Sequence, residues 1–85
     1  MGDLKYTHHA EQKFLVLKRH DFEVTVEQVE ETVLHPDRVI SHSGGRFIAQ
    51  RGITARHVLR VVYRMEMNIP VVITFYPGWK ERYED

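Results

Sequence analysis

The chain has 85 residues, enough for one small domain and too few for two, so residues 1–85 are expected to form a single domain. Its 42% hydrophobic content favours a folded chain, and the absence of cysteine excludes a disulfide framework, a cysteine-ligated metal and a thiol nucleophile. The formal net charge is zero, no apolar signal segment follows Met1, and the longest apolar run, residues 69–76, is too short to cross a bilayer. We therefore expect a cytoplasmic protein that does not bind membranes.

The first half of the chain is predicted to form two helices, near residues 8–20 and 25–35. Each begins after a threonine, Thr7 or Thr25, whose hydroxyl can accept a hydrogen bond from a free amide of the first turn. Apolar residues recur at helical spacing in both segments, and Pro36 prevents the second helix from continuing. The N-terminal half therefore predicts a pair of short helices.

The second half is predicted to form strands joined in sequential hairpins. Gly44–Gly45 supplies a tight turn, and Pro77–Gly78 is expected to end the last strand, leaving a polar and aromatic tail. The expected strands are residues 37–42, 46–51, 57–65 and 69–76. The predicted fold class is therefore α+β, with the two N-terminal helices packed on one face of a four-stranded, mostly antiparallel sheet.

The strand at residues 57–65 is the most informative for function, because successive side chains of a strand point to opposite faces. The apolar residues at every second position from Leu59 to Met65 are predicted to face the helices. Arg60 and Arg64 then share the opposite, open face of the sheet. His57 is predicted to lie on the Leu59 face, where a structural role is expected.

Positive charge is concentrated in the second half of the chain. Residues 1–45 carry five basic and eight acidic residues, a net charge of −3, whereas residues 46–85 carry seven and four, a net charge of +3. This asymmetry indicates either an anionic partner for the C-terminal half or pairing between acidic helices and basic strands. Five arginines are spaced through the region: Arg46, Arg51, Arg56, Arg60 and Arg64.

The arginines, together with the tail Trp79–Tyr83, suit the chemistry of RNA. Guanidinium groups fit phosphate oxygens, and they can neutralise the charge that these oxygens gain during cleavage. RNA supplies its own 2′-hydroxyl as nucleophile, so cleavage needs a base, an acid and cations but no metal. Tyrosine, lysine or histidine can act as acid or base, and Tyr83 and Trp79 can also stack on bases. The alternative is a solvated strand face without a chemical role.

Six histidines in a chain of this length are many, and histidine is a common metal ligand. The histidines include no pair spaced as H-x-H or H-x₃-H, the spacings that would direct two imidazoles at one ion. We therefore expect no metal and no other cofactor.

The residues Arg60-Val61-Val62-Tyr63-Arg64, the apolar strand at 71–76 and the basic tail Lys80–Tyr83 resemble the C-terminal half of RelE/ParE-type toxins. The first half, with His9-Ala10 before a helix and Pro36-Asp37 after the next, is similar to small domains grouped with BrnT-like toxins. The resemblance implies a RelE-like fold and a type II toxin–antitoxin toxin. Such a toxin cleaves mRNA, commonly on the ribosome, and is neutralised by a tightly bound antitoxin protein.

Carried over residue by residue, the resemblance implies that Arg60 stabilises the scissile phosphate, that Lys80 or Arg82 is the basic residue of the tail, and that Tyr83 is the terminal tyrosine. The residues expected to bind RNA around them are Arg46, Arg51, Arg64 and Trp79. Two alternatives remain: a gyrase-directed toxin of the ParE branch, and a non-catalytic module that binds a protein or RNA. Self-association in the absence of the antitoxin is also expected.

Overall fold

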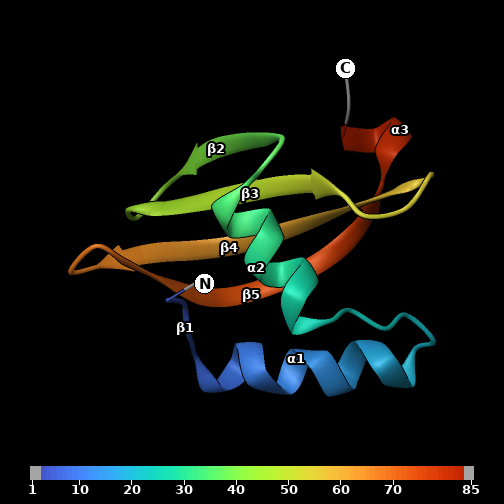
Figure 1. The fold of residues 1–85 in the computed structure, drawn as a ribbon, viewed down its shortest axis with the longest axis horizontal. Helices are drawn as coiled ribbons and strands as arrows, with labels where there is room; N and C mark the ends of the chain where they lie inside the picture. Colours follow the sequence, from blue (N-terminus) through green and yellow to red (C-terminus); the bar gives the residue numbers. More distant parts are fainter. Residues whose placement is uncertain (1–2, 84–85) are drawn as a thin grey trace.

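The computed structural model of the chain describes residues 3–83 as an α+β fold in which helices pack on a five-stranded mixed sheet (Figure 1). The strands lie in the order β1-β5-β4-β3-β2. In chain order the elements are β1 (Lys5–Tyr6), α1 (His8–Arg19), α2 (Val26–Leu34), β2 (Arg38–His42), β3 (Arg46–Gly52), β4 (His57–Glu66), β5 (Ile69–Trp79) and α3 (Lys80–Tyr83). The α+β class predicted from the sequence is confirmed, whereas the numbers of strands and helices differ.

The two N-terminal helices begin at the threonines that the sequence indicated. Thr7 Oγ1 accepts a hydrogen bond from the Ala10 amide at 3.1 Å, and Thr25 Oγ1 accepts one from the Gln28 amide at 3.1 Å. Gln28 Oε1 in turn accepts from the Thr25 amide at 3.0 Å, which completes a capping box. These contacts satisfy amides that have no partner within the helix, so both helix starts are defined locally.

Strands β2 to β5 form the predicted antiparallel meander. Its tight turns require positive φ angles: 76° and 73° at Gly44 and Gly45 between β2 and β3, and 49° and 67° at Met67 and Asn68 between β4 and β5. Two consecutive residues with positive φ give a turn whose twist matches that of the flanking strands. Glycine adopts this conformation without the steric cost that a side chain adds.

The prediction of four strands was wrong because the chain adds a fifth, β1, at its N-terminal side. Lys5 and Tyr6 pair in parallel with Val71 and Val72 of β5, and the Thr7 amide donates to the Val72 carbonyl at 3.0 Å. A strand of two residues is too short to show the alternation by which strands are recognised in a sequence.

The prediction that Pro77 and Gly78 end the last strand was also wrong. β5 continues to Trp79, with Pro77 opposite Leu59, and the tail then forms the short helix α3. Within the part of the chain that the structure describes, β1 pairs with β5 at residues 71–72 and no strand lies beside the rest of that edge. A proline is compatible with such an edge because a missing donor on the outer side interrupts no ladder.

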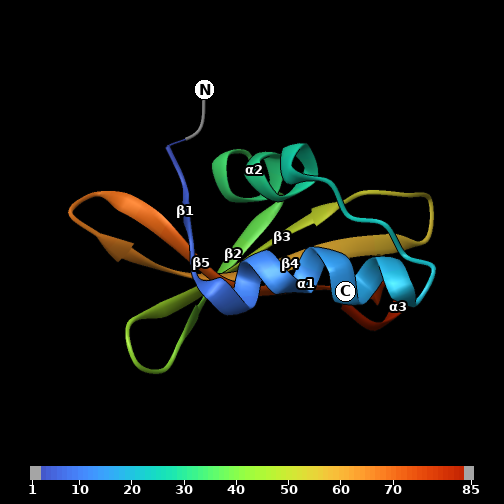
Figure 2. The same cartoon turned by 90° about the horizontal axis from the view of Figure 1, so that it is seen from below.

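The hydrophobic core lies between the two N-terminal helices and one face of the sheet. Leu59, Val61 and Phe75 from the sheet are 0% exposed, as are Ala10 of α1 and Val29 of α2. We call the opposite face of the sheet, which carries Arg60, the open face. Figure 2 shows α2 on one side of the sheet and α3 on the other, so α3 is the helix that covers part of the open face. Within residues 3–83, no helix is long and apolar enough to cross a membrane.

Candidate functional site

A row of four polar side chains crosses the open face from β2 to β5. The strand register places Arg38 opposite Gln50, Gln50 opposite Arg60, and Arg60 opposite Tyr76. Directly opposed residues of an antiparallel pair project from the same face, so the four side chains form a continuous line. Arg60 lies inside this line, as the alternation of β4 predicted.

Arg60 is buried, with 9% of its surface exposed, and both of its side-chain partners are neutral. Its Nε donates to the Tyr76 hydroxyl at 3.1 Å, and its Nη1 donates to Gln50 Oε1. Within residues 3–83, Arg60 forms no ion pair with an acidic side chain. Burying a cation without an opposite charge is costly, so such a residue is a candidate for a functional role.

Tyr83, at the end of α3, covers Arg60. Its ring centroid lies 4.3 Å from the Arg60 guanidinium carbon, which is cation–π geometry. Its backbone carbonyl accepts from Gln50 Nε2 at 3.3 Å and from Arg38 Nη1 at 3.4 Å. The site therefore consists of the polar row and the residue that closes over it.

Gly78 is what allows Tyr83 to lie so close to β5. A Cβ atom built at Gly78 would lie 2.3 Å from Tyr83 Cε2 and 2.8 Å from Cδ2, so any larger residue would displace the ring. The missing side chain of Gly78 is therefore a requirement of the closed arrangement.

Arg46 and Arg64 lie opposite each other at the other end of the open face. Arg64 donates from Nη2 and Nε to Glu66 Oε2 at 2.7 and 2.9 Å, and the two side chains are 43% and 47% exposed. An apolar row separates this pair from the Arg60 row: Ile40, Ile48 and Val62 are aligned across β2, β3 and β4. The predicted arginines of the open face are therefore divided between two ends of it.

Arg51 and Trp79 lie on the other face of the sheet, away from Arg60. Arg51 is opposite Leu59, and its Nη1 donates to the His35 carbonyl. Trp79 is opposite His57, and their rings lie 4.5 Å apart. Arg46 and Arg51 are separated by an odd number of positions on one strand, so strand alternation alone puts them on opposite faces.

Lys80 and Arg82 belong to α3 and differ in their surroundings. The Lys80 amide donates to the Arg56 carbonyl at 2.8 Å, which attaches α3 to the loop between β3 and β4. Lys80 Cε and Nζ both lie 3.2 Å from the position that a Cβ on Gly52 would take, next to the Arg60 row. Arg82 is exposed. The structure therefore brings Lys80 and Tyr83 onto the open face near Arg60.

Two tyrosines on the helix-covered side have altered acidities. Burial, with a smaller contribution from the negative charge of Glu30, raises the pKa of Tyr6 to about 12, and its buried hydroxyl has no hydrogen-bond partner among the described residues. Burial also raises the pKa of Tyr63. Within residues 3–83, no group of three or more histidine, aspartate or glutamate side chains is placed to hold a metal ion.

Comparison of the chain with protein-family models, with curated proteins and with solved structures found no match in any of the three. The resemblance to RelE/ParE-type toxins therefore rests on the residues of this sequence.

Proposed function

We propose that the chain is the toxin of a type II toxin–antitoxin system, with a RelE-like fold, and that it cleaves RNA without a metal ion. The observation that carries the proposal is the guanidinium of Arg60, whose hydrogen-bond partners Gln50 and Tyr76 are neutral. Its positive charge is therefore available to a phosphate whose oxygens gain charge in the transition state. The resemblance of β4, β5 and the tail to these toxins supports the same assignment.

In the proposed reaction, the 2′-hydroxyl of one nucleotide attacks the adjacent phosphorus. The new 2′-O–P bond forms as the P–O5′ bond breaks, which leaves a 2′,3′-cyclic phosphate and a free 5′-hydroxyl. A base takes the proton of the 2′-hydroxyl and an acid protonates the leaving 5′-oxygen. Arg60 holds the phosphate, Lys80 and Arg82 add positive charge, and Tyr83 stacks on a base or transfers a proton.

Access to Arg60 requires Tyr83 to move. In the closed arrangement the Tyr83 ring occupies the side of the guanidinium that a phosphate would approach. The segment that must move is short, since α3 spans Lys80–Tyr83. Lys80, Arg82 and Tyr83 would move together, so RNA binding and the arrangement of the tail residues are coupled in this proposal.

The decisive experiment compares Arg60→Lys with Arg64→Lys. Both substitutions retain a positive charge on the same face of the same strand, but lysine lacks the planar guanidinium fork. We expect Arg60→Lys to slow RNA cleavage about a hundredfold, and Arg64→Lys to reduce it by no more than a few-fold, in a salt-dependent way.

Cleavage of purified RNA, with and without translating ribosomes, and growth inhibition on expression are the measurements, and circular dichroism verifies folding of each variant. A folded Arg60→Lys variant that cleaves as fast as the wild type would overturn the assignment. Loss of cleavage in EDTA would overturn the metal-free mechanism.

One observation favours a second candidate, a non-catalytic module that binds a protein or RNA. Arg60 is 9% exposed beneath Tyr83, which suits a structural cation under a binding face better than a group in contact with substrate. The partly exposed apolar residues Ile40 and Val62, bordered by Arg46 and Arg64, would suit an acidic partner with apolar side chains. This candidate predicts a bound partner on co-purification and no RNA cleavage by the wild type under any of the conditions above.

A further inference from the structure

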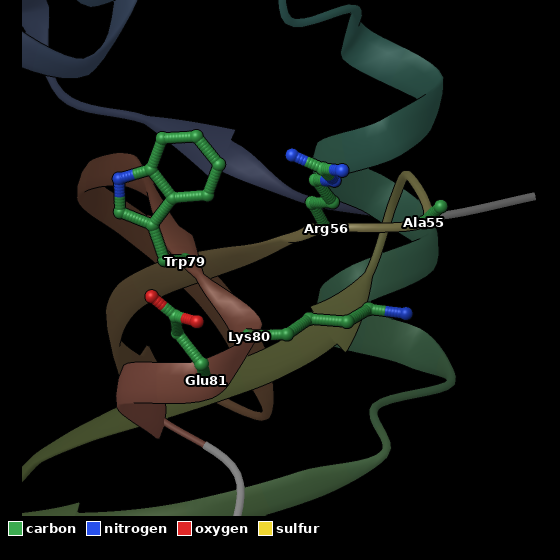
Figure 3. A pocket seen from close by; sticks show the side chains of 5 residues that line it. All are labelled: Ala55, Arg56, Trp79, Lys80 and Glu81. Carbon is green, nitrogen blue, oxygen red and sulfur yellow. The ribbon is translucent and has the colours of Figure 1, made fainter.

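A second site lies at the end of the sheet, beyond the Arg60 row, and shares Lys80 with it. Ala55 and Arg56 of the loop between β3 and β4, with Trp79, Lys80 and Glu81, line an open depression of about 580 Å³ (Figure 3). This volume falls within the range of about 300–1,000 Å³ that is typical of small-molecule sites. The lining combines an aromatic ring, two cations and a carboxylate.

Trp79 provides a rigid aromatic surface in this depression. One side of its indole rests against His57, with the ring centroids 4.5 Å apart and the planes inclined by 31°. His57 is itself held by Thr54 Oγ1, 3.0 Å from its Nδ1, and by Phe22, whose ring centroid lies 5.0 Å away. Trp79 nevertheless remains 50% exposed, so it can stack on a planar ligand with little loss of conformational freedom.

The backbone that carries the charged residues around Trp79 is also held in place. Arg56 is exposed, its amide donates to Thr54 Oγ1 at 3.2 Å, and its carbonyl accepts the Lys80 amide at 2.8 Å. Within residues 3–83, neither Arg56 nor Lys80 forms an ion pair with a carboxylate. Figure 3 shows Lys80 extending toward the loop at Ala55 and Arg56, with Glu81 beneath Trp79. The cations and the carboxylate thus occupy different parts of the depression.

We infer that this depression binds one ribonucleotide unit of a single-stranded RNA. The base stacks on Trp79, the phosphate pairs with Arg56 with added positive potential from Lys80, and Glu81 accepts a hydrogen bond from the ribose 2′-hydroxyl. The inference rests on the RNA-directed function proposed above, because it supplies a position for a nucleotide beside the one that is cleaved. It assigns a specific role to Arg56, which the sequence did not distinguish among the arginines.

The test uses the fluorescence of Trp79, the single tryptophan of the chain, during titration with adenosine 5′-monophosphate. We expect saturable quenching with a dissociation constant of about 1 mM, weaker quenching by deoxyadenosine 5′-monophosphate and by adenosine, and none by inorganic phosphate. Arg56→Ala should weaken binding of the monophosphate about tenfold, the loss expected for one charge-assisted contact. Glu81→Gln should reduce the preference for the ribonucleotide over the deoxyribonucleotide.

Lys5→Ala is the control, since it removes an exposed cation from β1, which pairs with β5 at Val71, far along that strand from Trp79. Its binding of the monophosphate should equal that of the wild type. The inference is overturned if adenosine 5′-monophosphate gives no saturable quenching, if the ribonucleotide and deoxyribonucleotide bind equally to the wild type, or if Lys5→Ala weakens binding as much as Arg56→Ala.

The titration requires no cleavage, so the two proposals can fail separately. If the Arg60→Lys variant cleaves RNA as fast as the wild type and the protein binds adenosine 5′-monophosphate at Trp79, the proposed role of Arg60 is overturned and the nucleotide site stands. An Arg60-dependent nuclease that does not bind adenosine 5′-monophosphate overturns the nucleotide site alone.

Discussion

Arg60 and Arg64 project from the same face of the same strand, four positions apart, into opposite environments. Arg60 is 9% exposed and bonds to the neutral groups of Gln50 and Tyr76, whereas the Arg64 side chain is 43% exposed and paired with Glu66. The difference comes from α3, which covers one end of the open face and leaves the other to solvent. The environment of a strand arginine therefore depends on the segment that covers it, and its charge alone does not indicate its role.

The largest expected effect on stability comes from removing Arg60, and removal of Arg64 is the comparison. We expect Arg60→Ala to lower the free energy of unfolding by about 2–4 kcal/mol, because it leaves a cavity under Tyr83 and unpaired polar groups on Gln50 and Tyr76. Arg64→Ala should change it by less than about 0.5 kcal/mol, since exposed ion pairs contribute little. Urea denaturation measures both, and equal losses would contradict the contrast between the two environments.

The next test displaces α3 without altering either arginine. Gly78 and Gly52 both lie opposite Val58 on the open face, from its two sides. Gly78→Ala places a methyl group against the Tyr83 ring, and we expect a loss of about 1–3 kcal/mol together with exposure of Arg60. Gly52→Ala meets the flexible end of Lys80 at 3.2 Å and Asp37 Oδ2 at an ordinary contact distance of 3.8 Å, so it should cost less than about 1 kcal/mol.

Denaturation together with the rate of proteolytic cleavage in the tail would measure this pair of variants. If the Gly78→Ala variant is as stable as the Gly52→Ala variant, the packing of Tyr83 against Gly78 does not hold α3 in place.

A third prediction extends the comparison to a buried polar group that lacks the partners Arg60 has. Burial raises the pKa of Tyr6 from 10.0 to about 12, so the unfolded chain loses this proton at a lower pH than the folded chain. The stability that depends on Tyr6 being protonated is therefore complete below pH 10 and is lost as the pH rises toward 12. Tyr6→Phe should reduce the loss of stability over this interval. At neutral pH it should stabilise the fold by up to about 1 kcal/mol, since it removes a buried hydroxyl without a hydrogen-bond partner.

The measurement is the difference in unfolding free energy between the wild type and Tyr6→Phe from pH 8 to pH 12. Other tyrosines, which ordinarily titrate at about pH 10, are present in both proteins, so the difference reports Tyr6 alone. A difference that does not vary with pH would contradict the raised pKa.

The smallest effect is expected at the exposed end of the open face. Glu66→Gln removes the partner of Arg64 and should lower stability by about 0.2–0.5 kcal/mol, an amount that disappears at high salt. Denaturation at low and high salt measures it. A loss above about 1 kcal/mol that persists in salt would mean that Arg64, like Arg60, depends on a partly buried environment.

Part of the candidate site could be predicted from the sequence. A bulge in β5 explains why the partner of Arg60 on that strand could not be predicted. Alternation along β4 correctly placed Arg60 and Arg64 on the open face. Counting back from the turn at residues 67–68 would set Arg60 opposite Phe75. An irregularity in β5 beyond Val72 shifts the register by one, and Tyr76 takes that place. A bulge reverses which side chains share a face, and no pattern in the sequence marked this one.

The tail is the other part that the sequence left open. Trp79 and Tyr83 were expected to act together, but Trp79 lies on the helix-covered side against His57, whereas Tyr83 lies on the open face against Arg60. The separation arises because β5 continues past Pro77 to Trp79 before the chain turns into α3. Where a strand ends depends on the neighbouring strand to which it bonds, and β4 was long enough to extend it.

The sequence by itself determined the helix starts at Thr7 and Thr25, the meander of four strands, and the face on which Arg60 lies. These features depend on capping, turns and alternation, which act between residues a few positions apart. The tertiary structure alone decided that Arg60 is buried and that Tyr83 closes over it, through contacts such as that between Gln50 and Tyr83, which are 33 residues apart. Such contacts depend on the path of the whole chain, because a buried cation with neutral partners is tolerated only where several strands and α3 converge on it.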